Sequence, residues 1–397
     1  MGPSPYQPVV PSDMDTGEIA TWPITVPSTW ATSDTVSWPS LRSAATMNCS
    51  VWLVWGAFRN AAVVTASMAA TSAAVSFLIS IFIGVVWRIH SRQIIRDRDE
   101  EVIAGVMLVV LGYGTVRLGE SGQRQSIKVG LVASDIPEND YIVDAGADAE
   151  RLLKAYATQA GDLASRGAQI VVMPEKIAAV RDGDVPADDA IFQAVADSSG
   201  AMIVAGELQV SPSAVGLLRY NRAKVFRPRA AAASYDKEHM LPPMESDETP
   251  GTAKLPLSLG KTRLGVAICK DMNFTSMSLA YADLGTELML VPAWDFNSDR
   301  TWHGHMAIMR GVEGGFSVAR AAKNGYLTIS DDRGRVIAEA RSDSGPFATL
   351  VADVRVGREL TLFQKWGNWF AWVAVAALAV AVARLAGMAL RSGVGAG

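Results

Sequence analysis

The sequence predicts an α/β domain flanked by membrane-spanning helices. Strand-like apolar runs alternate with amphipathic helical patterns through residues 122–360, which is typical of a layered α/β domain. Long apolar runs stand on both sides of that region, at 61–87, 102–118 and 369–390. The composition agrees, because 49% of residues are apolar, only 19% are charged and the mean hydropathy is +0.18.

Residues 1–60 are expected to form an irregular N-terminal arm, since the first 45 are rich in Pro, Ser, Thr and Trp and show little periodicity. No basic segment precedes an apolar one at the start, so a normal signal peptide is not expected. Trp22, Trp30 and Trp38 are either membrane-surface contacts or incidental, and the natural start of the chain is left open.

The apolar run 61–87 is long enough for a spanning helix, which needs about 20 apolar residues. The basic loop 88–101 follows and is expected to be cytoplasmic. The shorter run 102–118 is a second span or, alternatively, a buried helix. The run 369–390 is the last expected span, preceded by an aromatic cluster. We therefore expect a multi-pass cell-membrane protein whose 122–360 domain is extracytoplasmic.

Within 122–360 the strand-like runs are Lys128–Ser134, Gln169–Glu175, Ala201–Leu208, Lys224–Arg227, Arg263–Cys269, Leu288–Trp294, Ser317–Ala322 and Tyr326–Ser330. Helical patterns are expected at Ala145–Arg166, Asp188–Ser198 and Thr301–Gly314. In the first of these, Leu152, Leu153, Tyr156, Ala160 and Leu163 share one face at helical spacing.

Cys269 ends one of these runs, and charged residues follow it at once. Such a strand delivers a thiol to its carboxyl end, where open α/β folds bind ligands. The chain has only two cysteines, so a disulfide framework is not expected. The alternative is that Cys269 is a small core residue.

Two other stretches favour the nucleophile. Glu175 ends the apolar run that begins at Ala168, and Lys237 stands in a short polar segment before two prolines. A carboxylate can take the proton of a thiol, and a lysine can stabilise the oxyanion of a tetrahedral intermediate. The alternatives are a solvated acid and a surface lysine.

Glu, Lys and Cys in this order, each after a strand-like run, resemble the carbon-nitrogen hydrolase (nitrilase) superfamily. The resemblance implies an αββα sandwich of the nitrilase type. It also implies that Cys269 is the nucleophile, Glu175 the general base and Lys237 the oxyanion partner. Glu245, eight residues after Lys237, fits the family's second glutamate. The backbone N–H of Lys270 is a second oxyanion donor, and Trp294 and Asp295 are candidates for substrate contact. Arg310 and Glu313 are expected to pair on one helix face.

With spans on both sides, the chain looks most like apolipoprotein N-acyltransferase. The resemblance implies transfer of a fatty acyl group from phospholipid to a lipoprotein N-terminal amine. The alternative is a membrane-tethered amidase or nitrilase acting on a small C–N substrate, and a third is a non-catalytic binding module. An apolar groove would favour acyl transfer, and a small polar pocket the amidase. Lys270 and Asp271 stand where acyltransferases usually have tyrosine and glutamate.

Other classes are not expected. The net charge of −4 does not favour a nucleic-acid partner. The two cysteines and four histidines show no metal-ligand spacing, so neither a metal nor another cofactor is predicted. The oligomeric state is left open.

Overall fold

The computed structural model describes residues 97–119, 125–135, 141–214 and 216–394, all within one compact unit, Gly56–Gly397. The expected N-terminal arm, the span 61–87, most of the basic loop and Cys49 lie outside the described residues.

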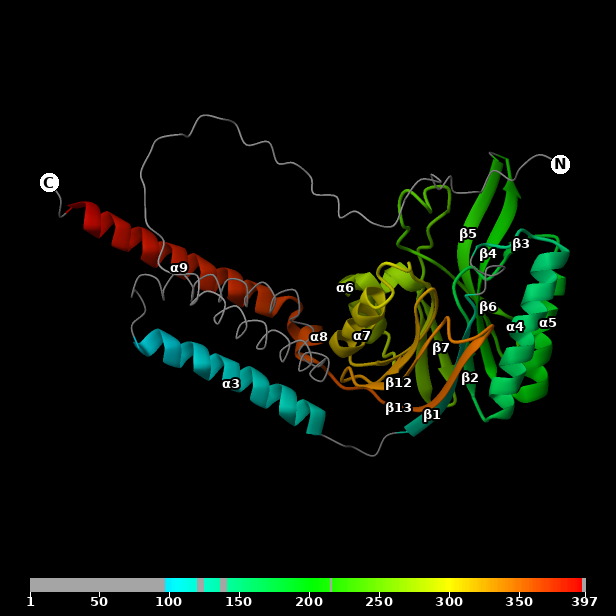
Figure 1. Cartoon of the computed structure of the whole chain (residues 1–397), viewed down its shortest axis with the longest axis horizontal. Helices are drawn as coiled ribbons and strands as arrows, with labels where there is room; N and C mark the ends of the chain where they lie inside the picture. The colour runs from blue at the N-terminus through cyan, green and yellow to red at the C-terminus, as the bar shows by residue number, and fades with distance from the viewer. Residues whose placement is uncertain (1–96, 120–124, 136–140, 215, 395–397) are drawn as a thin grey trace, which may run out of the picture. The chain divides into compact units, whose positions relative to one another are not determined.

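The described residues contain two mixed β-sheets (Figure 1). The first has seven strands: β1 (Gln125–Ala133), β2 (Ile170–Val172), β3 (Ala179–Arg181), β4 (Met202–Ser213), β5 (Gly216–Phe226), β6 (Ala233–Asp236) and β13 (Ala348–Val356). Its order is β13-β1-β2-β4-β5-β6, with β3 paired to β4. In this sheet β1, β2 and β4 run parallel.

The second sheet has six strands in the described residues: β7 (Leu255–Leu259), β8 (Thr262–Val266), β9 (Leu288–Trp294), β10 (Ser317–Lys323), β11 (Tyr326–Ser330) and β12 (Val336–Arg341). They follow the order β12-β11-β10-β9-β8-β7, and β8, β9 and β10 run parallel. Both sheets thus have a parallel centre and antiparallel edges.

The helices among the described residues are α3 (Asp97–Gly119), α4 (Ala147–Ser165), α5 (Val185–Ser199), α6 (Thr275–Asp283), α7 (Trp302–Gly314), α8 (Leu362–Trp366) and α9 (Trp369–Val394), with a 3₁₀ helix η3 (Cys269–Asn273). Helices α4 and α5 cover the outer face of the first sheet, and α6 and α7 cover that of the second (Figure 1).

Three hydrophobic clusters define the layers. One lies between the sheets and includes Val129 and Leu131 of β1 with Leu264 of β8. Val132, beside Leu131 on the same strand, points the other way and packs with α4 and α5. Because both faces of the central strands are buried, these strands appear in the sequence as continuous apolar runs. This arrangement is the predicted αββα sandwich.

Local sequence explains where the covering helices lie and end. The five residues expected to share a face of α4 are all buried, so that face was predicted correctly. Helix α5 has a proline in its first turn and ends at Gly200. Gly200 has a φ of 75°, a left-handed conformation that glycine adopts without a steric penalty.

All eight expected strands are present, although several have shifted ends. The largest correction concerns the nucleophile segment, where β8 ends at Val266 and Cys269 begins η3. The patterns expected from the sequence did not include β3, β6, β7, β12, β13, α6 or α8. Strands β7 and β12 are only five and six residues long, and no position in either is fully buried.

The expected membrane spans are not confirmed. Residues 102–118 lie in α3 and residues 369–390 lie in α9. Over the part of the chain that the structure describes, none of the helices is both long and apolar enough to cross a bilayer. In α3 the uncharged stretch is bounded by Glu101 and Arg117, and in α9 Arg384 interrupts the apolar run, so both stretches are shorter than about 20 residues. The multi-pass arrangement predicted from sequence is therefore unsupported.

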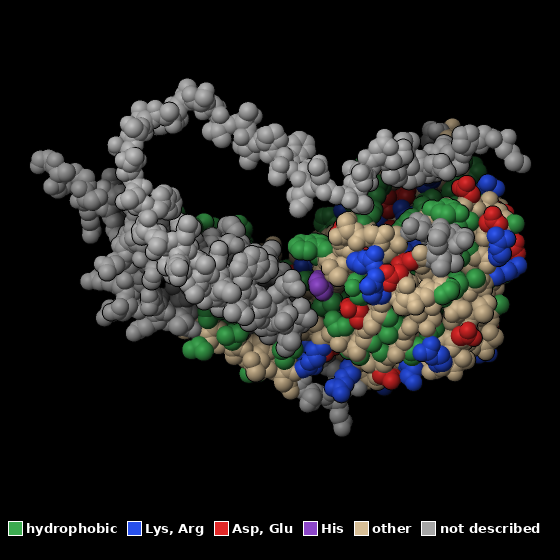
Figure 2. Space-filling model, viewed as in Figure 1, with side chains coloured by type: hydrophobic (Ala, Val, Ile, Leu, Met, Phe, Trp, Pro, Cys, Tyr) green, Lys and Arg blue, Asp and Glu red, His purple; other side chains and the backbone are tan. Residues whose placement is uncertain are grey.

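The surface of the sandwich carries charges of both signs. In the space-filling view, basic and acidic side chains lie in small mixed groups on the visible face (Figure 2). That face has no broad basic patch of the kind that binds nucleic acid.

Candidate active site

Two predicted site residues converge on the carboxyl end of β9. The backbone N–H of Glu175, which follows β2, donates to the carbonyl of Ala293 at 3.2 Å. The Sγ of Cys269, which follows β8, lies 3.4 Å from the carbonyl oxygen of Trp294. The two sheets therefore bring Glu175 and Cys269 to neighbouring carbonyls of one strand.

Cys269 occupies a strained turn between β8 and α6. Its φ is 40°, a left-handed conformation that is uncommon for residues other than glycine. The side chain is 8% exposed. Burial raises the pKa of the thiol to about 12, and the negative charge of Glu175 adds to this, while Lys237 opposes it. At neutral pH Cys269 is therefore a protonated thiol that needs a base before it can attack.

Lys237 directly follows β6 and is 1% exposed. Its Nζ donates to Oε1 of Glu175 at 2.8 Å and to Glu245 at 2.9 Å. Burial alone would lower the pKa of Lys237, but the charges of Glu175, Cys269 and Glu245 outweigh it and raise the pKa. Lys237 is thus a permanent cation beside both the acid and the thiol.

Glu245 lies where the second glutamate was predicted, in contact with Lys237. It is 3% exposed, and its Oε2 accepts a hydrogen bond from the backbone N–H of Leu241 at 2.8 Å. Its Oε1 accepts from the side chains of Lys176 at 2.6 Å and Asn221 at 2.9 Å. This saturation holds the carboxylate in one orientation toward Lys237.

Glu175 is 2% exposed and is held by Lys237 and by Nδ2 of Asn221, which donates to its Oε1 at 2.6 Å. Burial would raise the pKa of Glu175. The charges of Lys237 and Lys176 and the two hydrogen bonds outweigh burial, so the pKa falls below its ordinary value. Glu175 is therefore ionised at neutral pH, as a proton acceptor must be.

Asp271 connects the lysine segment to the nucleophile turn. It is fully buried, and its carboxylate accepts from the backbone N–H of Ile268 at 3.1 Å and from Tyr235 Oη at 2.8 Å. It also accepts from the backbone N–H groups of Glu238 and His239, at 3.2 and 2.9 Å. One carboxylate thus ties residues on both sides of Lys237 to both sides of Cys269.

The remaining predicted residues differ in their surroundings. The Nζ of Lys270 donates to the carbonyl of Met240 at 2.8 Å, and the role of its backbone N–H stays a prediction. The Trp294 ring lies 3.8 Å from Nζ of Lys323, and its substrate contact also stays a prediction. Asp295 is fully buried and both of its oxygens accept from Arg320, at 2.8 and 2.5 Å. The substrate contact of Asp295 also stays a prediction. Arg310 and Glu313 pair at 2.7 Å, as expected.

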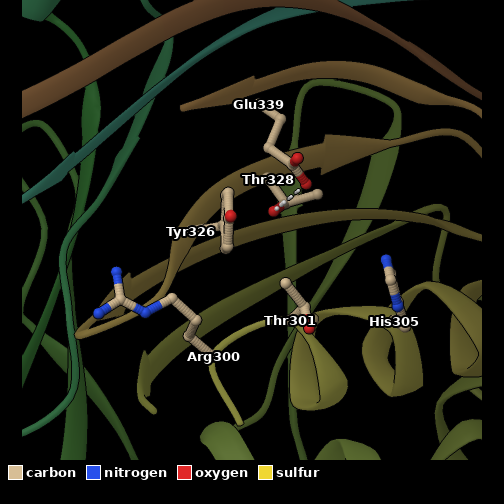
Figure 3. Close-up of a pocket in the computed structure, with 7 residues that line it drawn as sticks. Arg300, Thr301, His305, Tyr326, Thr328 and Glu339 are labelled. Atoms are coloured by element: carbon tan, nitrogen blue, oxygen red, sulfur yellow. Dashed lines mark hydrogen bonds between the residues drawn. The ribbon is translucent and has the colours of Figure 1, made fainter. Parts of the chain in front are cut away.

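A small cavity of about 60 Å³ lies between α7, β11 and β12 (Figure 3). Its lining includes Arg300, Thr301, His305, Tyr326, Thr328 and Glu339, with Thr328 Oγ1 donating to Glu339 at 3.3 Å. A cavity of this size holds a few water molecules. It contains none of the predicted site residues and does not decide between an acyl chain and a small amide.

Four site residues were missed by the sequence reading: Lys176, Asn221, Asp271 and Arg320. Asn221 lies between Tyr220 and Arg222 on β5 and shows no local signal. Lys176 directly follows Glu175, and Asp271 stands two residues after Cys269. This closeness to predicted catalytic residues was the only signal in the sequence that these two residues belong to the site. Their contacts join segments far apart in the chain, and periodicity cannot show such contacts.

The two sheets, packed face to face and covered by helices on their outer faces, form a nitrilase-type α/β fold. Residues 128–359 match the family described as carbon-nitrogen hydrolase. The chain belongs to the carbon-nitrogen hydrolase family.

The curated relatives include two apolipoprotein N-acyltransferases. The protein from Geobacter metallireducens is 27% identical over 343 residues, which cover 78% of this chain and 64% of the relative. The protein from Synechocystis is 25% identical over 283 residues, which cover 65% of this chain and 52% of the relative. The chain thus spans less than two thirds of the length of either. An (R)-stereoselective amidase from Pseudomonas is 33% identical over 72 residues, which cover 18% of this chain and 26% of the amidase.

Among solved structures, an amidase of the nitrilase superfamily from Nesterenkonia is similar, with a TM-score of 0.49 and 21% identity. The match covers 60% of this chain and 94% of the amidase.

Proposed function

We propose that this chain is an N-acyltransferase that forms a thioester on Cys269. The observation that carries the proposal is the buried cluster in which Lys237 joins Glu175 and Glu245 beside a thiol on a strained turn. The similarity to two apolipoprotein N-acyltransferases supports a phospholipid as acyl donor and a lipoprotein N-terminal amine as acceptor.

In the first half-reaction, Sγ of Cys269 attacks the ester carbonyl carbon of the donor while Glu175 takes the thiol proton. The carbonyl oxygen becomes an oxyanion, which the Lys237 ammonium and the backbone N–H of Lys270 stabilise. The C–O bond to the leaving alcohol then breaks, and Glu175 returns the proton to that alcohol. The product is an acyl thioester on Cys269.

In the second half-reaction, the acceptor amine attacks the thioester carbon and loses a proton to Glu175. The C–S bond breaks, and Cys269 recovers its thiol as Glu175 returns the proton. An amide is formed when water is excluded, whereas water in place of the amine would give hydrolysis.

The donor is proposed to reach the site from a lipid surface. Trp366 and Trp372 are exposed by 63% and 72%, next to further exposed apolar side chains of α9. Exposed tryptophans of this kind suit a membrane interface, where one part of the ring is apolar and another is wet. No spanning helix is required for this contact.

The alternative is hydrolysis of a small amide. It is favoured by the low exposure of Cys269, 8%, which suits a compact substrate. The short stretch similar to the Pseudomonas amidase supports it as well.

The test is intact-protein mass spectrometry of the full chain after incubation with phospholipid vesicles. We expect a hydroxylamine-sensitive gain of one fatty acyl group, absent in Cys269→Ala and retained in the matched control Cys49→Ala. Ammonia release from small amides without a lipid adduct would establish the alternative. Neither signal in a folded chain would refute both.

A further inference from the structure

Lys176 is a second buried lysine in the site, directly after Glu175. It is 6% exposed and has a φ of 46°. Its Nζ donates to Oε1 of Glu245 at 2.6 Å and to Oε1 of Glu248 at 2.8 Å. Burying an ammonium group is costly unless it is paired, and both of its partners are themselves buried.

The left-handed backbone at Lys176 has a geometric consequence. Neighbouring side chains in an extended chain point to opposite faces. Here Glu175 and Lys176 both reach one cluster, because Asn221 donates to Glu175 and to Glu245, the partner of Lys176. A non-glycine residue with a positive φ persists only where the surroundings enforce it.

The charges of the cluster show what Lys176 contributes. Three buried carboxylates, Glu175, Glu245 and Glu248, face two ammonium groups, Lys176 and Lys237. If Lys176 were absent, Lys237 would be the only ammonium group paired with Glu175 and Glu245 among the described residues. Its charge would then be divided between the acid and the positioning glutamate, while Glu248 would be left buried without a cation.

We propose that Lys176 is a positioning residue: it neutralises Glu245 and Glu248, so that Lys237 stays available to Cys269 and Glu175 stays ionised as the proton acceptor. The inference rests on the proposed roles of Glu175 and Cys269. It adds a second cation to the site.

Charged and titratable groups face Glu175 from each surrounding segment: Lys176, Lys237, Glu245, Glu248, Cys269 and Arg320. Burial raises the pKa of Glu248, and the charges of Glu245 and Glu175 raise it further, while Lys176 lowers it. Burial would lower the pKa of Lys176, but the charges of Glu175, Glu248 and Glu245 raise it. Both directions agree with one coupled network.

The sign of the effect follows. Because Lys176 lowers the pKa of Glu175, removing the ammonium raises that pKa. A nearby charge shifts a pKa by about 1–3. A reaction that needs ionised Glu175 slows at low pH, and we call that falling part of its pH–rate profile the acid limb. In Lys176→Met the acid limb should move to higher pH by about one pH unit. At a pH on the acid limb the rate should therefore fall about tenfold.

The experiment measures the rate at which iodoacetamide alkylates Cys269 in the full chain, from the lowest pH at which the chain stays folded up to about pH 9, followed by intact mass. Glu175→Gln tests whether the acid limb belongs to Glu175, because a variant without this carboxyl group should lack the limb. Lys176→Arg should keep the wild-type limb. Glu248→Gln should move it to lower pH, and Lys176→Met/Glu248→Gln should lie between the two single variants. Melting curves verify that each variant is folded.

An unmoved acid limb in folded Lys176→Met would overturn the inference, and so would a double variant whose acid limb lies outside the interval between the two single variants. If Lys176→Met does not fold, Glu248→Gln provides the test. An acid limb of Glu248→Gln at the wild-type pH would also overturn the inference. Alkylation needs no acyl donor, so the readout is independent of the proposed function. Shifted alkylation without any acyl adduct would refute acyl transfer and leave the role of Lys176 standing.

Discussion

Gly206 on β4 packs against the turn that carries Glu175, and Gly206→Ala should displace that turn. The backbone N–H of Gly206 donates to the carbonyl of Pro174 at 3.1 Å, and its carbonyl accepts from Ile177 at 2.8 Å. A Cβ at this position would lie 2.3 Å from the Pro174 oxygen and 2.7 Å from Cα of Glu175. Both are backbone atoms, so no flexible side chain can move aside.

The magnitude follows from these distances. Ordinary van der Waals contact begins near 3.4 Å, so the turn must retreat by about 1 Å. A displacement of about 1 Å in a catalytic group can cost about 10²-fold in rate, which corresponds to about 2.7 kcal/mol. Overpacking a filled interior costs about 1–3 kcal/mol of stability in addition.

The assay is the rate of acyl adduct formation on Cys269 together with the melting temperature. The matched control is Gly161→Ala on α4, where an added Cβ meets nothing within 4 Å. That variant should keep the wild-type rate and gain up to about 1 kcal/mol from helix propensity. A Gly206→Ala variant with the wild-type rate and melting temperature would refute the argument that this turn rests on the Gly206 backbone.

Two further predictions concern buried charges. Arg320→Met leaves the carboxylate of Asp295 buried without its cation and should cost about 3–5 kcal/mol in urea unfolding. A loss of stability below about 1 kcal/mol would contradict the view that Asp295 needs Arg320 as its buried counter-ion. Burial raises the pKa of Glu207 to about 7 from 4.5, against the opposing charge of Lys224. The folded state therefore binds this proton more tightly, and stability should fall by about 3 kcal/mol as pH rises from 4.5 through 7. Glu207→Gln should remove this part of the pH dependence, and an unchanged stability–pH curve would contradict the assignment.

The elements and contacts that the sequence did not reveal have several physical causes. Strands β7 and β12 are short and have no fully buried position, so neither forms the long continuous apolar run of a central strand. Asn221 escaped because its partner Glu175 is 46 positions away, on the neighbouring part of the sheet. The expected spans 102–118 and 369–390 are helical, but their crossing of a membrane is not confirmed, and Arg117 and Arg384 shorten their uncharged stretches.

The sequence by itself determined the α/β layering and the segments that carry Glu175, Lys237 and Cys269. It could do so because strands buried on both faces leave continuous apolar runs, and the change to polar residues marks where each run ends. The contact of Lys237 with Glu175, across 62 positions, required the resemblance to a family before it could be proposed.

Only the tertiary structure decided the conformation of Cys269, the pairing of Lys176 with Glu245 and Glu248, and the contacts that gather on Asp271. Each depends on atoms brought together by sheet pairing and by packing between the sheets. Local propensity has no access to such distances, because a buried polar side chain chooses its partner by what the fold places within about 3 Å.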